Sequence, residues 1–316
     1  MSAEAHRSFA CFGGTATLHV AGSAHGRRAD AAAGEAEARL LEAHERLSRF
    51  IPGSELCRLN TDSRRTVPVS GLLLEVAAAA RRAGLLSGGL VDATLRREIE
   101  QAGYDESLAG KRDRPGPGRV PASDSPRPAS ASPNRGWSRI TVDRRAGTVS
   151  RPPGVEIDSG GIAKGLLADL VAESLSGHAD YAVDCCGDVR VGGTSGRPRR
   201  VLVQDPAGGE PVHELAVSDG GVATSGIGRR SWIADDGRPA HHLLDPSTGR
   251  PAYTGIVQAT ALAPTAFLAE VYSKYALLSG RPLARERLPY GGVLVLEEGG
   301  VEVVDPRAVT AGAAAA

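Results

Sequence analysis

Seven short runs divide this chain, and each places a turn-forming residue beside a polar or aromatic side chain. In order they are Phe-Gly-Gly-Thr (12–15), Ser-Arg-Phe-Ile-Pro-Gly-Ser-Glu-Leu (48–56), Gly-Gly-Leu-Val-Asp-Ala-Thr (88–94), Asp-Ser-Gly-Gly-Ile-Ala-Lys-Gly (158–165), Cys-Gly-Asp-Val-Arg-Val-Gly-Gly (186–193), Ala-Thr-Ser-Gly (223–226) and His-His-Leu-Leu-Asp-Pro-Ser-Thr-Gly (241–249). Glycine and proline interrupt regular elements, so each run is expected to contain a turn. Any one of these runs alone would be an ordinary turn. Only the seven runs together, in this order, form a pattern that distinguishes this chain.

The spacing of apolar residues along the chain predicts helices and strands. Ala36, Leu40 and Leu47 share one helix face, whereas residues 15–20 alternate like a half-buried strand. Helices are expected at 31–48, 71–86, 91–102, 162–176 and 265–279. Strands are expected at 15–20, 154–157, 181–184, 188–192, 200–204 and 257–263, with hairpins over 139–150 and at 293–296 with 301–304. Because the elements mix without a strict β-α-β alternation, the predicted class is α+β. The length of 316 residues allows one large domain or two small ones.

Residues 106–137 differ in composition from the rest of the chain. From Arg114 to Gly136 the sequence is dense in proline, serine, arginine and glycine, with hardly any large apolar residues. Such a stretch buries too little surface to offset the entropy of ordering it. We expect a disordered insertion within the domain, and a flexible tail over 306–316.

Charge and cysteine usage exclude several classes of protein. Lys plus Arg and Asp plus Glu are equal at 37 each, so no basic excess favours nucleic acid or an anionic membrane. No run of about 18 apolar residues occurs, and residues 1–10 lack the apolar segment of a secretion signal. The four cysteines show no metal-binding spacing. We expect a cytoplasmic protein with reduced thiols and no membrane insertion.

The run from Asp158 to Gly165 is the first candidate for binding chemistry. Its glycines let backbone N–H groups approach an anion, and the start of a helix attracts negative charge. Lys164 would add a positive charge suited to a pyrophosphate. The run is neither a Walker A loop nor a dinucleotide fingerprint, and a plain turn with a surface lysine is the structural alternative.

The run from His241 to Gly249 is a candidate for proton transfer. His242 stands three residues before Asp245 in a turn shaped by Pro246. Imidazole titrates near neutral pH, so this histidine can accept a proton. A structural turn with two ordinary histidines is the alternative.

Two further polar groups have weaker signals. Ser225, near Arg230, offers a hydroxyl beside guanidinium groups that suit phosphate or ribose, although a polar loop is the simpler interpretation. Glu270 and Lys274 are four residues apart on the expected helix 265–279, where an exposed salt bridge is the simpler interpretation.

In series, the seven runs resemble the ApbE family of FAD:protein FMN transferases (flavinyltransferases), from about Phe12 to Gly280. The resemblance implies a mixed α/β, T-fold-like core that binds FAD in a cleft between its two halves. It also implies a single domain over residues 1–316, because family motifs lie on both sides of the insertion. It further implies that magnesium helps to cut the FAD pyrophosphate. FMN is then attached to a Thr or Ser of an acceptor flavoprotein with an FMN-binding domain, and AMP is released.

The resemblance and the motifs together assign roles to positions. His242 and Lys274 are the expected catalytic residues, with His242 taking the proton of the acceptor hydroxyl. Gly161, through its carbonyl, and Glu270 are the expected metal ligands. The expected cofactor-binding residues are Gly13, Phe50, Leu90, Val91, Asp92, Asp158, Lys164, Ser225, Asp245 and Thr248. Among them, Phe50 matches an aromatic that stacks on the isoalloxazine.

The chain departs from the family pattern at the metal. The family typically has Asp and, four residues later, Thr on the late helix, where this chain has Glu270 and Lys274. Glutamate still offers oxygen to Mg²⁺, but an ammonium has no lone pair to give. We hypothesise that Lys274 takes over part of the metal's work by stabilising pyrophosphate charge. The alternative is weak metal binding with reduced or lost activity.

Two other functions would use the same residues. With water as the acceptor the chain would be an FAD pyrophosphatase giving FMN and AMP, and without reaction it would be a non-catalytic FAD-binding protein. The three functions differ in where FMN ends up: bound covalently to a protein, released free, or still part of FAD. A Rossmann-type enzyme is disfavoured because its glycine fingerprint is missing.

Overall fold

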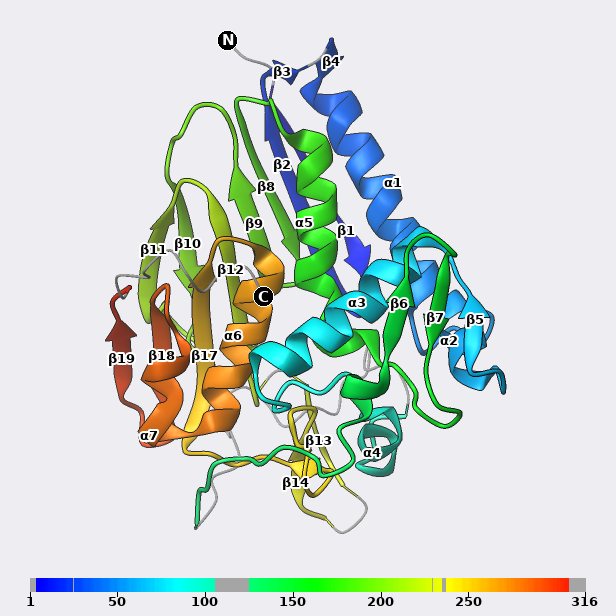
Figure 1. Ribbon diagram of the computed structural model, residues 1–316. Helices are drawn as coiled ribbons and strands as arrows, with labels where there is room; N and C mark the ends of the chain where they lie inside the picture. Colours follow the sequence, from blue (N-terminus) through cyan, green and yellow to red (C-terminus); the bar gives the residue numbers. More distant parts are fainter. Residues whose placement is uncertain (1–3, 25, 106–124, 229, 235–236, 307–316) are drawn as a thin grey trace.

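An eight-stranded antiparallel sheet forms the centre of the molecule (Figure 1). The computed structural model describes residues 4–24, 26–105, 125–228, 230–234 and 237–306. In spatial order the strands are β1 (Glu4–Cys11), β2 (Gly14–Ala21), β8 (Asp180–Cys185), β9 (Asp188–Gly192), β12 (Gly220–Gly226), β17 (Ile256–Ala263), β18 (Gly292–Leu296) and β19 (Val301–Val304). Every neighbouring pair is antiparallel, so hairpins and longer returns connect the strands.

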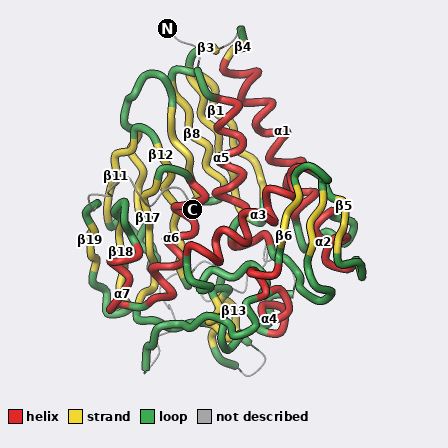
Figure 2. The backbone as a smooth tube through the Cα atoms, in the orientation of Figure 1, coloured by secondary structure: helices red, strands yellow, loops and turns green. Residues whose placement is uncertain are grey.

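Three helices cover one face of this sheet (Figure 2). Helix α1 (Ala29–Leu47) packs on β1 and β2, α5 (Ala163–Leu175) on β8 and β9, and α6 (Ala266–Ser279) on β12 and β17. The core lies between these two layers and includes Leu18, Leu40, Leu167, Val183 and Val271. Among the described residues, no helix is long and apolar enough to cross a membrane.

Strand β2 shows how the sequence builds this core. Ala16, Leu18 and Val20 are fully buried, while Thr15 is exposed and Thr17 partly so. Successive side chains of a strand point to opposite faces. The apolar set therefore faces the helices, and the polar set lines the open face of the sheet.

Two tight turns lie side by side at one end of the sheet. Phe12 and Gly13 join β1 to β2 with φ of 46° and 73°, and Cys186 and Gly187 join β8 to β9 with φ of 60° and 97°. Positive φ at both central residues is typical of type I′ hairpins. Since β2 pairs with β8, the turns are neighbours, and the Cys186 thiol donates to the Cys11 carbonyl oxygen at 3.1 Å.

A hairpin packs on the opposite face of the sheet. It consists of β10 (Arg199–Val203) and β11 (His213–Val217). Its apolar side chains form a small cluster with the sheet that includes Val191, Val203, Leu215, Val217 and Val222. The sheet is therefore covered by helices on one face and partly by this hairpin on the other.

Most of the remaining elements gather at the end of the sheet near the two turns, whereas the short strands β3 (Ser23–Ala24) and β4 (Arg27–Arg28) lie at its opposite end, after β2 (Figure 1). The elements near the turns include helix α3, which packs on α5. The longer ones are α2 (Glu55–Thr61), α3 (Gly71–Leu86), α4 (Arg96–Gln101) and a small sheet of β5 (Thr66–Pro68), β7 (Thr148–Ser150) and β6 (Thr141–Asp143). The shorter ones are β13 (Ser231–Ile233), β14 (Pro239–His241), β15 (Leu244–Asp245), β16 (Arg250–Pro251), α7 (Arg281–Ala284) and three 3₁₀ turns at Gly136–Arg139, Ser159–Gly161 and Arg285–Arg287.

The predicted α+β class is confirmed, and three expected elements are wrong. The helix expected over 91–102 begins only at Arg96, because the chain first forms a turn. Residues 154–157 form no strand, since the Asn60 side chain takes both backbone hydrogen bonds of Ile157 at 2.8 Å. The polar loop expected around Ser225 is the end of central strand β12, paired along its length with β17.

The predicted insertion and tail fall partly outside the described residues, which omit 106–124 and 307–316. For 125–137 the prediction of disorder is wrong. The backbone N–H groups of Arg127 and Ala129 donate to the carbonyls of Tyr253 at 3.0 Å and Leu278 at 2.9 Å. Trp137 is buried. These contacts to distant parts of the chain offset the ordering entropy, and composition alone could not reveal them.

Candidate active site

Two cavities meet beside the turns at 12–13 and 186–187. One is a slot of about 340 Å³. The other is a groove of about 800 Å³ between the open face of the sheet and the β10–β11 hairpin. Both are lined by Gly13, Gly160, Lys164, Arg230, His242 and Lys274. Runs that are far apart in the sequence therefore converge at this junction.

One wall of the slot is aromatic and carries a guanidinium group. The ring centroids of Phe50 and Tyr104 are 5.6 Å apart. Tyr104 stacks on Trp232 at 5.5 Å, with 27° between the ring planes. The Arg49 guanidinium carbon lies 4.3 Å from the Phe50 centroid and 4.7 Å from that of Tyr104. A planar ligand can stack on such a surface.

The turn after α3 supplies further lining residues, Leu90, Val91 and Asp92. The Ser87 hydroxyl accepts from the Val91 N–H at 2.8 Å, which fixes the turn. Oδ1 of Asp92 accepts from the Thr94 N–H at 2.8 Å. Among the described residues, Oδ2 of Asp92 has no hydrogen-bond partner, and burial raises the pKa of this carboxyl. Asp92 is thus a polar residue of the slot lining with one buried acceptor atom unsatisfied.

A buried ionic cluster lies at the junction of the cavities. The Lys164 ammonium, from the start of α5, pairs with Asp188 at the start of β9 and lies 3.0 Å from Oε1 of Glu270. Nζ of Lys274, one turn further along α6, is also 3.0 Å from this oxygen. Oε2 of Glu270 accepts from the Gly165 N–H at 2.9 Å. Glu270 is 0% and Lys274 8% exposed, so the exposed salt bridge considered from the sequence is wrong.

The charges of the cluster depend on one another. Burial by itself would raise the pKa of Glu270, but Lys164 and Lys274 outweigh burial and lower this pKa to about 2. Burial would lower the pKa of Lys164, but Asp188 and Glu270 outweigh it and raise this pKa. For Lys274 burial dominates and lowers the pKa. Opposite charges within a few ångströms thus favour the ionised forms of Glu270 and Lys164, whereas burial opposes the charge of Lys274.

His242 follows β14 and lines both cavities. Its Nδ1 lies 3.3 Å from the carbonyl oxygen of Arg230. A carbonyl oxygen only accepts, so Nδ1 carries the proton and Nε2 keeps its lone pair. Burial, followed by the charges of Arg230, His241 and Lys274, lowers the pKa of His242 well below its usual value. A neutral imidazole of this tautomer can accept a proton at Nε2.

Most of the predicted site residues line these cavities. They are Gly13, Phe50, Leu90, Val91, Asp92, Asp158, Gly161, Lys164, Ser225, His242 and Lys274. Asp158 also caps the following 3₁₀ turn, because its Oδ1 accepts from the Gly160 N–H at 2.9 Å. Ser225 is largely buried, and its hydroxyl oxygen lies 2.8 Å from that of Ser273 on α6. These two side chains are thus partly committed to the scaffold.

Asp245 and Thr248 lie apart from both cavity linings. Oδ1 of Asp245 accepts from the N–H groups of Ser247 at 2.9 Å and Ser130 at 3.1 Å. Thr248 is exposed. The structure therefore places both residues in the loop after His242, and Asp245 connects that loop to residues 125–137.

The sequence interpretation gave no role to three residues that now belong to the site. Arg49 and Asp188 lie inside two of the seven runs, where a charged residue beside a turn was a usable signal. Tyr104 had none, because its place beside Phe50 depends on how α4 packs. Arg230 was noted as a guanidinium suited to phosphate or ribose, with a polar loop as the simpler interpretation. Its guanidinium approaches the turn at Phe12, with Nη2 3.4 Å from the carbonyl oxygen.

The residues present do not fit the magnesium ion that the resemblance implies. Mg²⁺ needs oxygen ligands in near-octahedral geometry, but both carboxylate oxygens of Glu270 already accept from N–H donors. Beside Gly161 stands Lys274, since a Cβ added to that glycine would lie 3.7 Å from Cε of the lysine. In the described part of the chain, no group of three or more His, Cys, Asp or Glu side chains could hold a metal.

The fold and site define an α+β ligand-binding protein whose apolar slot opens onto charged groups. The ApbE family profile matches residues 12–290, and the chain belongs to this family. Relatives named FAD:protein FMN transferase, from Haemophilus influenzae and Salmonella typhimurium, are 28% and 29% identical, each over 80% of this chain and 73% of its own length. The family resemblance predicted from the seven runs is confirmed.

Solved structures agree with this assignment. The crystal structure of the ApbE protein from Thermotoga maritima matches with a TM-score of 0.75 at 25% identity, covering 95% of this chain and 97% of that one. The apo flavinyl transferase ApbE from Pseudomonas stutzeri matches with a TM-score of 0.74 at 23% identity, covering 96% and 95%, and this second likeness shows the fold alone. The predicted ApbE-like mixed α/β fold is confirmed.

Proposed function

We propose that this chain is an FAD:protein FMN transferase, which cuts FAD and attaches FMN through a phosphoester to a Thr or Ser of an acceptor protein. The observation that carries the proposal is the junction of the slot and the groove at His242, Lys164 and Lys274. FAD has a matching shape, since a flat apolar ring system is joined through a pyrophosphate to a polar nucleoside. Curated relatives bear the name of this activity.

The slot suits the isoalloxazine. Phe50 and Tyr104 would stack on the ring system, and Arg49 would hold the two rings in place. Asp92, which lines the slot, would contact the polar edge of the flavin. The pyrophosphate would then lie at the junction, near the two lysines.

The chemistry is a displacement at phosphorus. Nε2 of His242 takes the proton of the acceptor hydroxyl, whose oxygen attacks the FMN phosphorus. A new P–O bond to the acceptor forms, the bond to the bridging oxygen of the pyrophosphate breaks, and AMP leaves with the electron pair. The protein contributes positioning, proton transfer and fixed positive charge.

The acceptor is proposed to be a flavoprotein with an FMN-binding domain, and the location to be the cytoplasm. The cytoplasm is in keeping with the free thiols of Cys11, Cys57, Cys185 and Cys186. Magnesium remains a prediction from the resemblance and has no step in this mechanism, because the donor atoms at Gly161 and Glu270 do not fit it.

The test is to incubate the purified chain with FAD and an FMN-binding-domain protein, and to follow the intact mass of that protein. A gain equal to one FMN unit is expected, with AMP released in equal amount. The matched control is the same acceptor with its threonine replaced by alanine, which should gain nothing. Free FMN and AMP without a mass gain would instead indicate the pyrophosphatase, and intact bound FAD the non-catalytic carrier.

A further inference from the structure

We propose that the Lys274 ammonium occupies the place at which the resemblance puts a metal ion, so that this chain transfers FMN without a divalent cation. The inference deepens the proposed function and rests on it for the transfer reaction. Its structural half, that no divalent cation binds between Gly161 and Glu270, can be tested without any activity.

Lys274 lies against both expected metal ligands. Its Nζ is 3.0 Å from Oε1 of Glu270 and 3.5 Å from the backbone carbonyl oxygen of the same residue. On its other side is Gly161, where an added Cβ would be 3.7 Å from Cε of the lysine. Because Lys274 lines the slot and the groove, its side chain lies where a pyrophosphate would bridge them.

The acceptor atoms around Lys274 are already hydrogen-bonded and their charges are balanced, which disfavours a further cation there. Oε1 of Glu270 already accepts from two ammonium groups, those of Lys164 and Lys274, and Oε2 accepts from the Gly165 N–H. The Asp188 carboxylate pairs with Lys164. Two ammonium groups thus face two carboxylates, and a divalent ion would have to displace Lys274 and remain beside the like charge of Lys164.

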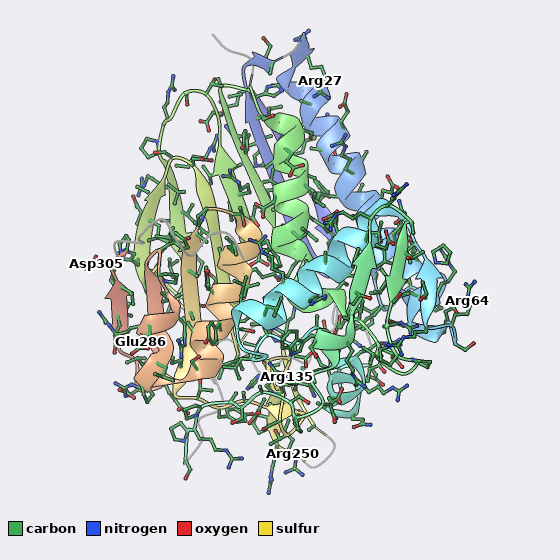
Figure 3. The ribbon with its side chains drawn as sticks, viewed as in Figure 1. Arg27, Arg64, Arg135, Arg250, Glu286 and Asp305 are labelled. Atoms are coloured by element: carbon green, nitrogen blue, oxygen red, sulfur yellow. The ribbon has the colours of Figure 1, made fainter. Side chains whose placement is uncertain are left out.

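The chain places lysine here although it uses arginine almost everywhere else. Three of its 37 basic residues are lysines, at positions 111, 164 and 274, and two of them meet in this cluster. Arginines such as Arg27 and Arg64 lie at the edge of the molecule (Figure 3). An ammonium is a compact point charge, whereas guanidinium is a broad planar fork. Of the two, ammonium is the closer substitute for a small cation.

A fixed cation at this position acts on the leaving group. As the pyrophosphate bond breaks, negative charge grows on the AMP oxygen, and an ammonium already held in position by Glu270 stabilises that charge without reorganisation. Removing one such contact from an enzyme typically costs about 10²–10³-fold in rate. We expect a loss of this size when Lys274 is replaced by methionine, which keeps the length of the side chain and removes its charge.

The first experiment uses the wild-type protein. Transfer of FMN to the acceptor is measured in excess EDTA and in millimolar Mg²⁺, and binding of Mn²⁺ to the protein is measured by electron paramagnetic resonance. The proposal expects the same transfer rate in both buffers and no Mn²⁺ bound at this site. Transfer that EDTA abolishes and Mg²⁺ restores would overturn it, as would bound Mn²⁺ that Glu270→Gln removes. Mn²⁺ that stays bound in Glu270→Gln lies elsewhere and agrees with the proposal.

The second experiment compares Lys274→Met with Arg285→Met. The second variant removes an exposed cation that is paired with Glu302 and lines neither cavity. A loss of about a hundredfold in Lys274→Met alone, in both buffers, is expected, and equal rates in the two variants would overturn the catalytic role. If the wild type transfers nothing and FAD stays intact, the proposed function has failed. The Mn²⁺ measurement then decides this inference by itself.

Discussion

Gly165 on α5 lies directly against the backbone of Ala266 on α6. A Cβ built on Gly165 would be 2.5 Å from the carbonyl oxygen of Ala266, a distance that real side chains do not reach. Only glycine fits this contact. The same glycine donates its N–H to Glu270, so the contact that joins the helices also sets the position of the ionic cluster.

Replacing Gly165 by alanine is expected to lower the free energy of unfolding by about 1–3 kcal/mol, because the added methyl forces α5 and α6 apart. Urea unfolding followed by circular dichroism measures the change. Gly71→Ala is the matched control, since no atom lies within 4 Å of the added Cβ at that helical position. Equal destabilisation in the two variants would mean that the approach of α5 to α6 is not tight.

His242→Asn is expected to lower the rate of FMN transfer by about 10²–10⁴-fold while FAD still binds, because asparagine cannot take the proton of the acceptor hydroxyl. The rate comes from the intact mass of the acceptor, and the FAD affinity from quenching of flavin fluorescence. A rate close to that of the wild type would exclude His242 as the base. Equal loss of FAD affinity would indicate a binding role instead.

Tyr104→Leu is expected to weaken FAD binding by about tenfold, or about 1.4 kcal/mol, because one side of the stacking surface is removed. A fluorescence titration with FAD measures the affinity. Tyr290→Leu serves as the control, since Tyr290 packs against Tyr272 at 6.1 Å and lines neither cavity. Unchanged affinity in Tyr104→Leu would place the flavin outside the slot.

Stability is expected to fall as the pH falls from about 6.5 to about 3, in part because of His241. Burial lowers the pKa of His241 to about 3, whereas the unfolded chain has the ordinary value of about 6.5. Between these values the unfolded state binds the additional proton, so acid favours unfolding by up to about 1.4 kcal/mol per pH unit.

The variant that isolates this effect is His241→Phe, in which a ring remains packed against Tyr253, whose centroid lies 4.9 Å from that of His241. Urea unfolding at several pH values gives the slope of stability against pH for both proteins. A shallower slope in the variant over this window is expected. Identical slopes would assign the acid sensitivity to other groups.

The sequence predicted the elements whose signal is local. The burial of alternate residues in β2 follows from its pattern, and the helix expected over 31–48 was found at 29–47 because its apolar face repeats at the helical period. Predictions from the sequence were wrong where contacts with a distant part of the chain decide the local structure. Asn60 replaces a strand partner for Ile157, and the segment 125–137 is ordered by contacts with residues more than 100 positions away.

By itself, the sequence determined the family and most of the residues that line the site. These residues stand in or beside glycine turns, and such turns can be recognised from a few neighbouring residues. Only the tertiary structure decided what Glu270 and Lys274 do. Two charges one turn apart on a helix normally face water, and here the packing of α6 against α5 and β9 buries them with Lys164 and Asp188. In that buried setting their charges no longer interact mainly with solvent. We infer that the Lys274 ammonium takes the place expected for a metal.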